Sequence, residues 1–414
     1  MLEGLSCFPA YTPVFVTLSA SAGIAGWYLL QLTGQKLSVG IAWTLIFVPG
    51  ILFLPFSASL LDLCKARSVI LFFEVLKVLL LLAAASFLVV RPSSGVVYLL
   101  SILFGLAFAP FYPMGYVAVK RYSQSDVVAK HSSLLEVSIQ IACIIGVVLT
   151  GFLLEKIGFV AILFLASAFG LASVVVAVLL KPATGDENRQ GVFEYFLRSS
   201  AKNSLVSFSS AIKKSIALSG RYRQTAWFGL IHQIPQNLIL VSNVPLLIYV
   251  SDAMKKGPFE YGLLDAVFSV LALGCGFYWS TRKCFSLSSV ALSSVCSGVT
   301  LVLFGLVSPN GLMPYLVMIL LAVAMVSAKI HSRSFLLQIV DESDIGVLSS
   351  FFQLVSYVVM LAMFFLISFL CDRWHVSFAY YALGICALLY AVLVKVILVT
   401  QSRQTVSESS LTTG

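Results

Sequence analysis

Charged residues are scarce in this sequence. Only 10% of its 414 residues are Asp, Glu, Lys or Arg, whereas soluble globular domains carry about 25%. Hydrophobic residues make up 60% of the chain, and the mean hydropathy is +1.01. A chain with so few charges is poorly suited to a surface that water must solvate. The composition therefore predicts an integral membrane protein in contact with membrane lipids.

Motifs of several enzyme and cofactor classes are also missing. The sequence has no GxxxxGK[ST] segment, which argues against an ATP-driven motor on this chain. It has no HExxH, no GxSxG and no Cys/His cluster with metal-ligand spacing, and none of its eight cysteines forms a CxxC pair. We therefore expect neither an enzyme nor a bound cofactor or metal.

The excess of basic residues is not concentrated anywhere. The formal net charge is +9, but the Lys and Arg residues are spread over many short loops, so nucleic acid is not an expected partner. The N-terminal sequence MLEGLSCFPAYTP has no basic segment before its first apolar run, so no cleaved signal peptide is expected.

Apolar residues gather in long runs. A helix needs about 20 apolar residues to cross a bilayer, and these runs do not alternate with the period of a barrel strand. Twelve runs qualify: 12–33, 38–60, 69–90, 95–118, 133–155, 158–180, 225–250, 259–281, 284–307, 312–336, 346–370 and 376–399. The sequence predicts an all-α integral membrane protein of twelve transmembrane helices in two six-helix pseudo-repeats, a layout typical of transporters.

A polar stretch divides the two sets of runs. We expect a six-helix bundle over residues 1–180, a cytoplasmic amphipathic linker over 181–224, a second bundle over 225–400 and a cytoplasmic tail over 401–414. Placing both termini in the cytoplasm puts nineteen Lys and Arg residues on that side and six on the other. The expected location is the plasma membrane, of the bacterial inner-membrane type.

A charged segment, LPFSASLLDLCKARSVIL, joins the second and third runs. Asp62 is followed by Lys65 and Arg67. A carboxylate and cations in a short cytoplasmic loop can pair with a neighbouring bundle and hold a gate shut in one state. Ordinary enrichment of cytoplasmic loops in cations explains Lys65 and Arg67 equally well, but it does not explain Asp62.

This segment resembles the signature of the major facilitator superfamily, G-x-L-x-D-R-x-G-R-R between helices 2 and 3. The chain keeps Asp62 and Arg67, whereas Ala58, Leu63 and Lys65 depart from the pattern. The resemblance implies a transporter fold with a gating loop at this point.

A second segment, residues 104–159, is rich in residues that bend helices or let them approach closely. These residues are Gly105, Pro110, Pro113, Gly115, Gly146 and Gly151. Together with the AKHSSLLE sequence, the segment resembles the branch of the superfamily that contains lysophospholipid transporters and macrolide-efflux proteins. The lysophospholipid transporters resemble this chain slightly better, because they share Leu76-Lys77 in the third run and Glu136 at the start of the fifth. The SASAGIAGWYLL sequence lacks the Asp-Asn pair of that family's first helix, and Gly115 stands where that family has a Lys.

Polar residues within apolar runs are candidates for the substrate and ion pathway, because each is costly there and usually faces the interior of a bundle. They are Glu74, Lys77, Glu136, Gln140, His232, Gln236, Asn237 and Asp265. The alternative for each is a structural pair or a hydrogen bond between helices. Lys77 could bind an anionic or zwitterionic head group, or its pair with Glu74 could act as a latch. A substrate that is an apolar cation would instead need an unpaired acid and aromatic rings.

The function that we expect is secondary active transport of a small amphipathic, lysophospholipid-like substrate by alternating access, with a proton or sodium as a possible coupling ion. One alternative is proton-coupled efflux of drugs or macrolides. An alternative of another class is a polytopic scaffold or receptor that transports nothing.

Overall fold

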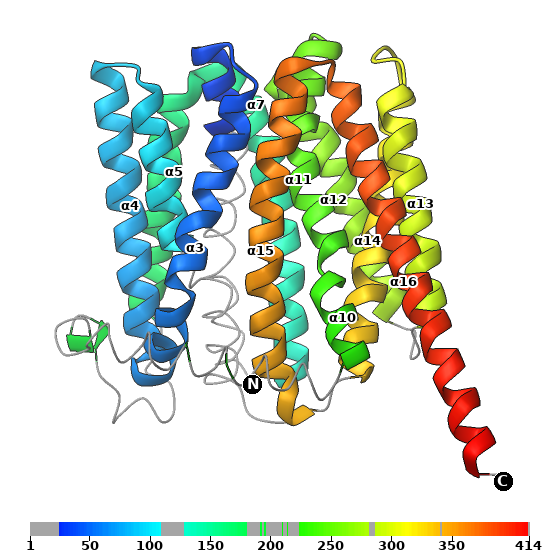
Figure 1. The fold of residues 1–414 in the computed structure, drawn as a ribbon. Coiled ribbons are helices and arrows are strands. Elements are labelled where there is room, and N and C mark those ends of the chain that lie inside the picture. Colours follow the sequence, from blue (N-terminus) through cyan, green and yellow to red (C-terminus); the bar gives the residue numbers. More distant parts are fainter. Residues whose placement is uncertain are drawn as a thin grey trace. The chain divides into compact units, whose positions relative to one another are not determined.

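The structure is a computed structural model that describes residues 25–108, 128–179, 191, 192, 194, 195, 209, 213, 223–280, 286–339 and 342–412. All elements in these ranges are helices (Figure 1). The chain forms two compact units, which we describe one at a time. Unit 1 is Met1–Phe208 with Val250–Ser269, and unit 2 is Ser209–Tyr249 with Val270–Gly414.

Unit 1 contains most of the helices of the first half of the chain. They are a helix over residues 25–33, α3 (Leu37–Leu63), α4 (Ala66–Val90), α5 (Ser94–Phe108) and α7 (Val128–Leu179). Gly158, with φ 76° and ψ 171°, divides α7 into a first arm of residues 128–157 and a second arm of residues 159–179 (Figure 1). This positive φ is one that glycine adopts without steric cost. The unit also takes in most of the π-helix η1 (Tyr249–Ala253) and the beginning of α12 (Pro258–Ser280).

Unit 2 contains the remaining helices. They are α10 (Arg223–Ile231), α11 (Ile234–Ile248), the end of α12, α13 (Leu287–Leu306), α14 (Met313–Ile339), α15 (Glu342–Arg373) and α16 (Val376–Thr412). The helix α13 packs along both α14 and α16, while α11 packs on α14, α15 and α16. Phe228, Phe352 and Tyr390 belong to one buried apolar cluster of this unit.

The described helices follow the predicted apolar runs closely. Eight of them are long and apolar enough to cross a membrane, and two shorter apolar helices cover Leu37–Leu52 and Ser94–Leu106. One of the eight, Ile144–Leu179, contains the break at Gly158, which is the first residue of the sixth predicted run. The all-helical membrane fold is thus confirmed. The total of twelve spans, the two-repeat layout, the orientation of the termini and the predicted domain boundaries stay predictions, and most of the expected linker lies outside the described residues.

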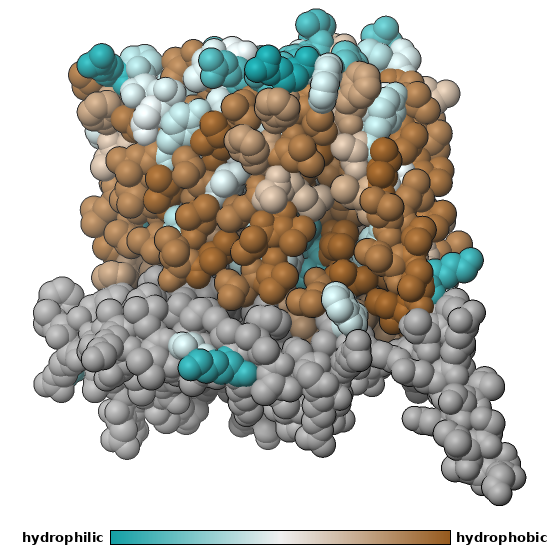
Figure 2. Space-filling model, viewed as in Figure 1, coloured by the Kyte–Doolittle hydropathy of each residue, from teal (hydrophilic) through white to brown (hydrophobic). Residues whose placement is uncertain are grey.

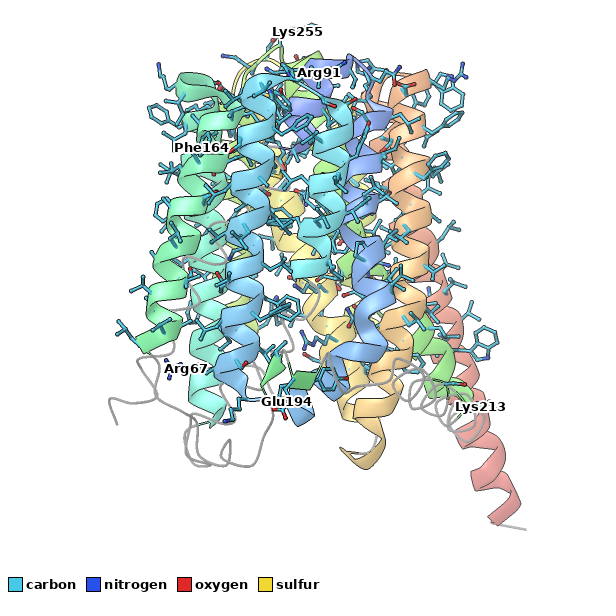
Figure 3. All side chains as sticks on the ribbon, turned by 90° about the vertical axis from the view of Figure 1, so that its left-hand side faces the viewer. Arg67, Arg91, Phe164, Glu194, Lys213 and Lys255 are labelled. Atoms are coloured by element: carbon cyan, nitrogen blue, oxygen red, sulfur yellow. The ribbon has the colours of Figure 1, made fainter. Side chains whose placement is uncertain are left out.

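The surface of these helices is suited to lipid. Apolar side chains cover the middle of the described helices, and hydrophilic side chains gather at one end (Figure 2). Within unit 1, Arg67 and Glu194 lie at one end, and Arg91 and Lys255 lie at the other (Figure 3). Large apolar side chains such as Leu79, Phe365 and Val392 are exposed, as expected where lipid tails replace water.

Close helix contacts occur at glycines. A Cβ atom on Gly105 of α5 would lie 2.0 Å from the carbonyl oxygen of Ile46 in α3. In unit 2, Gly298 of α13 and Gly384 of α16 face each other, and a Cβ on either would lie 2.9 Å from the other's carbonyl oxygen. Such backbone approach allows dense packing where no hydrophobic effect drives helices together.

Candidate functional site

Glu74 and Lys77 form an ion pair on α4. The Lys77 ammonium lies 2.7 Å from a Glu74 carboxylate oxygen, and their side chains are only 5% and 2% exposed, respectively. Gly170 on the second arm of α7 packs here, since a Cβ on it would lie 2.6 Å from Val78 Cγ2 and 3.9 Å from Lys77 Cε. The pair is therefore buried where α4 meets α7, with each charge compensated by the other.

The loop motif is described in part. Arg67 donates a hydrogen bond to the carbonyl of Val178, near the end of α7, so it ties two helices of unit 1 together. A cation is favourable at that position because the last carbonyls of a helix carry partial negative charge. Lys65 is exposed. The side chain of Asp62 lies outside the described residues, so the proposed gating role stays a prediction.

The seventh predicted run is a broken helix. The helix α10 ends at Ile231, α11 begins at Ile234, and Pro235 near its start has no N–H to donate. The carbonyl of His232, at the break, accepts a hydrogen bond from Ser332 Oγ at 2.8 Å. His232 Nδ1 lies 2.5 Å from the Gly229 carbonyl, which can only accept, so this nitrogen carries the proton. Two side-chain groups therefore contact backbone carbonyls at or next to the break.

Asn237 connects α11 to α15. Its amide nitrogen donates to the Ser356 carbonyl at 3.1 Å, and Ser356 Oγ donates back to Asn237 Oδ1 at 3.0 Å. Gln236, its neighbour, differs: its Oε1 is buried and accepts no hydrogen bond from the part of the chain that the structure describes. The Asn237 amide therefore joins two helices, whereas the Gln236 amide oxygen is available to a ligand.

Asp265 on α12 differs from the other described acids of unit 1. Within the described ranges its carboxylate makes no hydrogen bond or ion pair, whereas Glu74, Glu155 and Asp252 all have partners. One turn earlier on the same helix lies Tyr261, whose ring centroid is 6.5 Å from that of Trp27. Residues four apart share a helix face, so an acid and two aromatic rings lie on one side of α12.

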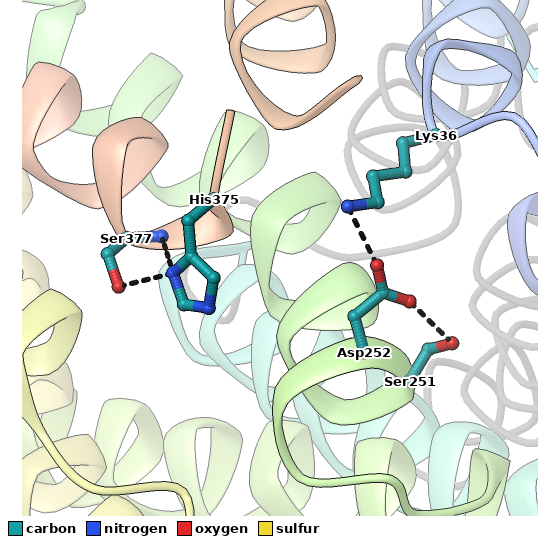
Figure 4. Close-up of polar contacts among 5 residues, drawn as sticks. All are labelled: Lys36, Ser251, Asp252, His375 and Ser377. Carbon is teal, nitrogen blue, oxygen red and sulfur yellow. Dashed lines mark hydrogen bonds and ion pairs between the residues drawn. The ribbon is translucent and has the colours of Figure 1, made fainter. Parts of the chain in front are cut away.

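Val250–Ser269 is joined to the rest of unit 1 by polar contacts. Lys36, between the helix of residues 25–33 and α3, pairs with Asp252 of η1 at 2.8 Å (Figure 4). Glu155 on the first arm of α7 accepts a hydrogen bond from the Phe259 amide at 3.2 Å, at the start of α12. A carboxylate is favourable there because the first amides of a helix have no intrahelical partner.

Two glycines bring α12 against α7. A Cβ on Gly151 would lie 2.6 Å from the Pro258 carbonyl oxygen, and one on Gly262 would lie 2.8 Å from the Val147 carbonyl oxygen. Gly146 accepts a hydrogen bond from Thr150 of its own helix. The approaches at Gly151 and Gly262 hold the helix that carries Tyr261 and Asp265 close against α7.

Several sequence candidates lie outside the described residues. Pro110, Pro113 and Gly115 are among them, as are the side chains of Glu136 and Gln140. The described candidates fall in separate places: Glu74 and Lys77 between α4 and α7, Asp265 on α12 in unit 1, and His232, Gln236 and Asn237 in unit 2.

Sequence reasoning missed Trp27, Tyr261, Lys36, Asp252 and Glu155. Only Tyr261 carried a usable signal, because it precedes Asp265 by one helical turn.

Comparisons with known proteins agree with this architecture. A comparison with curated proteins gives no match. Among solved structures, the crystal structure of the nucleoside transporter NupG is 13% identical, with a TM-score of 0.70 over 96% of this chain and 99% of that chain. The peptide transporter-family (POT) protein PepTSo is also 13% identical, with a TM-score of 0.74 over 97% and 98% of the two chains. At this identity the likeness shows the fold. The family model of the Major Facilitator Superfamily matches residues 7–364, and the protein therefore belongs to that superfamily.

Proposed function

We propose that this protein is a secondary transporter that moves a small amphipathic substrate by alternating access. The observation that carries the proposal is the attachment of Val250–Ser269, which follows α11 of unit 2 in the chain, to the helices of unit 1. A partly exposed ion pair, Lys36–Asp252, and a carboxylate at the start of α12 join it there. Contacts of this kind are worth only about 1 kcal/mol each, so they can break and re-form within a transport cycle.

The sequence resemblance favours a lysophospholipid-like substrate whose head group Lys77 would bind. In the structure the Lys77 ammonium has Glu74 as its partner and is nearly inaccessible. An anionic head group would have to displace Glu74, which would then be left buried and uncompensated. The two assigned roles, a head-group site and a latch, both remain proposals for this pair.

A second candidate function is proton-coupled transport of cationic amphipaths, as in multidrug efflux. The observation that favours it is Asp265, an acid in a membrane-spanning segment that has no partner among the described residues. A carboxylate of this kind can exchange a proton or bind a cation. Glu136 and His232 stay proposed members of the proton path, and sodium remains the other proposed coupling ion.

Reconstitution of the purified chain tests both candidates. Liposomes with an imposed pH gradient or an imposed sodium gradient are given radiolabelled lysophosphatidylethanolamine or radiolabelled methylphenylpyridinium, an organic cation that crosses bilayers slowly. We expect accumulation of at least one compound under at least one gradient, abolished when an ionophore collapses that gradient. Uptake of both compounds at the rate of protein-free liposomes would overturn the proposal and leave the scaffold or receptor reading.

A further inference from the structure

We propose that Asp265, Tyr261 and Trp27 form a binding site for an organic ammonium or similarly soft cation. The inference rests on the proposed function and names the substrate class of that transporter. All three residues belong to unit 1, so the site is complete within one compact part of the chain.

Asp265 supplies the charge. It lies on α12, in the membrane-spanning segment Pro258–Trp279. Isolated charges in such segments are costly and persist where they face a cavity or a partner. Glu74 has Lys77 as its partner, whereas no described residue neutralises Asp265. A positively charged ligand would supply the missing partner.

Tyr261 and Trp27 supply the aromatic surface. Both are well buried, at 7% and 5% exposure, and their ring centroids are 6.5 Å apart. The face of an aromatic ring attracts a cation, most strongly when water is excluded. Tyr261 lies one helical turn from Asp265, which has no partner among the described residues, and Trp27 lies next to Tyr261. An acid and two aromatic rings grouped in this way favour a cation that carries apolar groups over a strongly hydrated ion.

Trp27 adds a directional hydrogen-bond donor. Its Nε1 is buried and meets no acceptor in the part of the chain that the structure describes. Burying an indole N–H without a partner costs about 1–3 kcal/mol, so an acceptor atom on the ligand would relieve it. An acceptor oxygen on the cation would therefore strengthen binding, although the carboxylate and the ring faces can hold a cation without one.

Neighbouring contacts hold these groups in place. The Tyr28 ring stacks on Phe159 with centroids 4.2 Å apart, which anchors the helix that carries Trp27. Gly262, next to Tyr261, lies so close to the Val147 backbone that no side chain fits between them. A site held by rigid helices requires little reordering when a ligand binds.

The site chemistry argues against anions and metal ions. A carboxylate repels phosphate and sulfate groups. A hard cation such as Mg²⁺ or Ca²⁺ would need several oxygen ligands, and no cluster of three or more His, Cys, Asp or Glu residues occurs among the described residues. An organic cation needs only the one carboxylate and the aromatic faces.

Binding of tetraphenylphosphonium tests the site. The full-length protein in lipid nanodiscs is titrated with radiolabelled tetraphenylphosphonium, and unlabelled naphthalene-2-sulfonate, an aromatic anion, serves as competitor. Loss of a buried charge partner lowers affinity by roughly thirtyfold or more, so we expect that effect from Asp265→Asn. Asp265→Glu keeps the charge and should retain binding. Trp27→Leu, which removes one ring, should weaken binding about threefold to thirtyfold.

Glu260→Gln is the matched control, because Glu260 lies on the same helix but pairs with exposed Lys256 at 3.4 Å. It should bind tetraphenylphosphonium like the unmodified protein. The proposal is overturned if Asp265→Asn binds with unchanged affinity, or if naphthalene-2-sulfonate competes as well as unlabelled tetraphenylphosphonium does.

The site and the proposed function can fail separately. If the unmodified protein does not bind tetraphenylphosphonium yet moves lysophosphatidylethanolamine, the cation site is wrong and secondary transport stands. If it binds tetraphenylphosphonium through Asp265 but moves nothing down a gradient, the site stands and transport is wrong.

Discussion

The Lys36 ammonium lies 2.8 Å from the Asp252 carboxylate, joining the beginning of the chain to the segment that follows α11. Asp252 also accepts a hydrogen bond from Ser251 Oγ at 3.2 Å (Figure 4). Both members of the ion pair are partly exposed, so their attraction is weakened by water. The pair is therefore suited to a contact that opens and closes rather than to one that holds the fold together.

Lys36→Ala should make the start of α12 more accessible. The test uses a variant without native cysteines in which Leu264, fully buried on α12, is replaced by Cys. The rate at which this Cys reacts with a membrane-impermeant maleimide is measured. Because an exposed ion pair is worth up to about 1 kcal/mol, we expect the rate to rise by up to about fivefold.

Charge reversal, Lys36→Asp with Asp252→Lys, should restore the original rate. Equal rates in Lys36→Ala and the unmodified protein would contradict a gating role, and Lys256→Ala serves as control.

Lys77→Met should destabilise the protein strongly. Removing one member of a buried ion pair leaves the other charge uncompensated, at a cost of about 3–5 kcal/mol. Glu74→Gln combined with Lys77→Met should recover most of that loss, as measured by unfolding in detergent. Recovery of stability together with unchanged substrate binding would assign the pair a structural or latch role. Recovery of stability with loss of lysophospholipid binding would instead support a head-group site.

Gly105→Ala should destabilise unit 1 by about 1–3 kcal/mol, because the added methyl would overlap the Ile46 backbone, which cannot move as a side chain can. The matched control is Gly274→Ala on α12, where a Cβ meets nothing within 4 Å. That control should be neutral or stabilising by about 0.5–1 kcal/mol, since alanine favours a helix more than glycine does. Similar melting temperatures for the two variants would disprove the close approach of α3 and α5.

Asn237→Leu should weaken the contact between α11 and α15. It leaves Ser356 without its two partners on Asn237, and a buried polar group without a partner costs about 1–3 kcal/mol. Asn243→Leu is the control, because among the described residues its amide donates to carbonyls of its own helix, those of Ile239 and Leu240. Thermal unfolding should separate the two variants. If they unfold alike, the reciprocal bond contributes little.

The fold followed from the sequence because apolar run length is a local property. The runs at 69–90 and 376–399, for example, coincide with α4 and with most of α16. The break in α7 falls at Gly158, the first residue of the sixth predicted run, next to the predicted gap where the sequence EKIG interrupts the apolar pattern. The i, i+3 spacing of Glu74 and Lys77 placed them on one face, although it could not reveal that Gly170 packs beside them.

The candidate site was less predictable. Asp265 was recognisable as an acid within an apolar run, but Trp27 was not, because a chain with 31 Phe and 16 Tyr residues offers no reason to single out one ring. The Lys36–Asp252 pair and the Glu155 contact at α12 join residues far apart in the chain. Such contacts depend on how helices are arranged in space, which spacing along one helix does not encode.

The assignment of Asp265 to the binding site of a transported organic cation is best tested by gradient-driven uptake of methylphenylpyridinium into liposomes that contain the unmodified protein, Asp265→Asn or Glu260→Gln. The unmodified protein and Glu260→Gln should accumulate the cation, whereas Asp265→Asn should show only background uptake. Accumulation by Asp265→Asn at the level of the unmodified protein, or background uptake by all three, would show that Asp265 does not bind a transported cation.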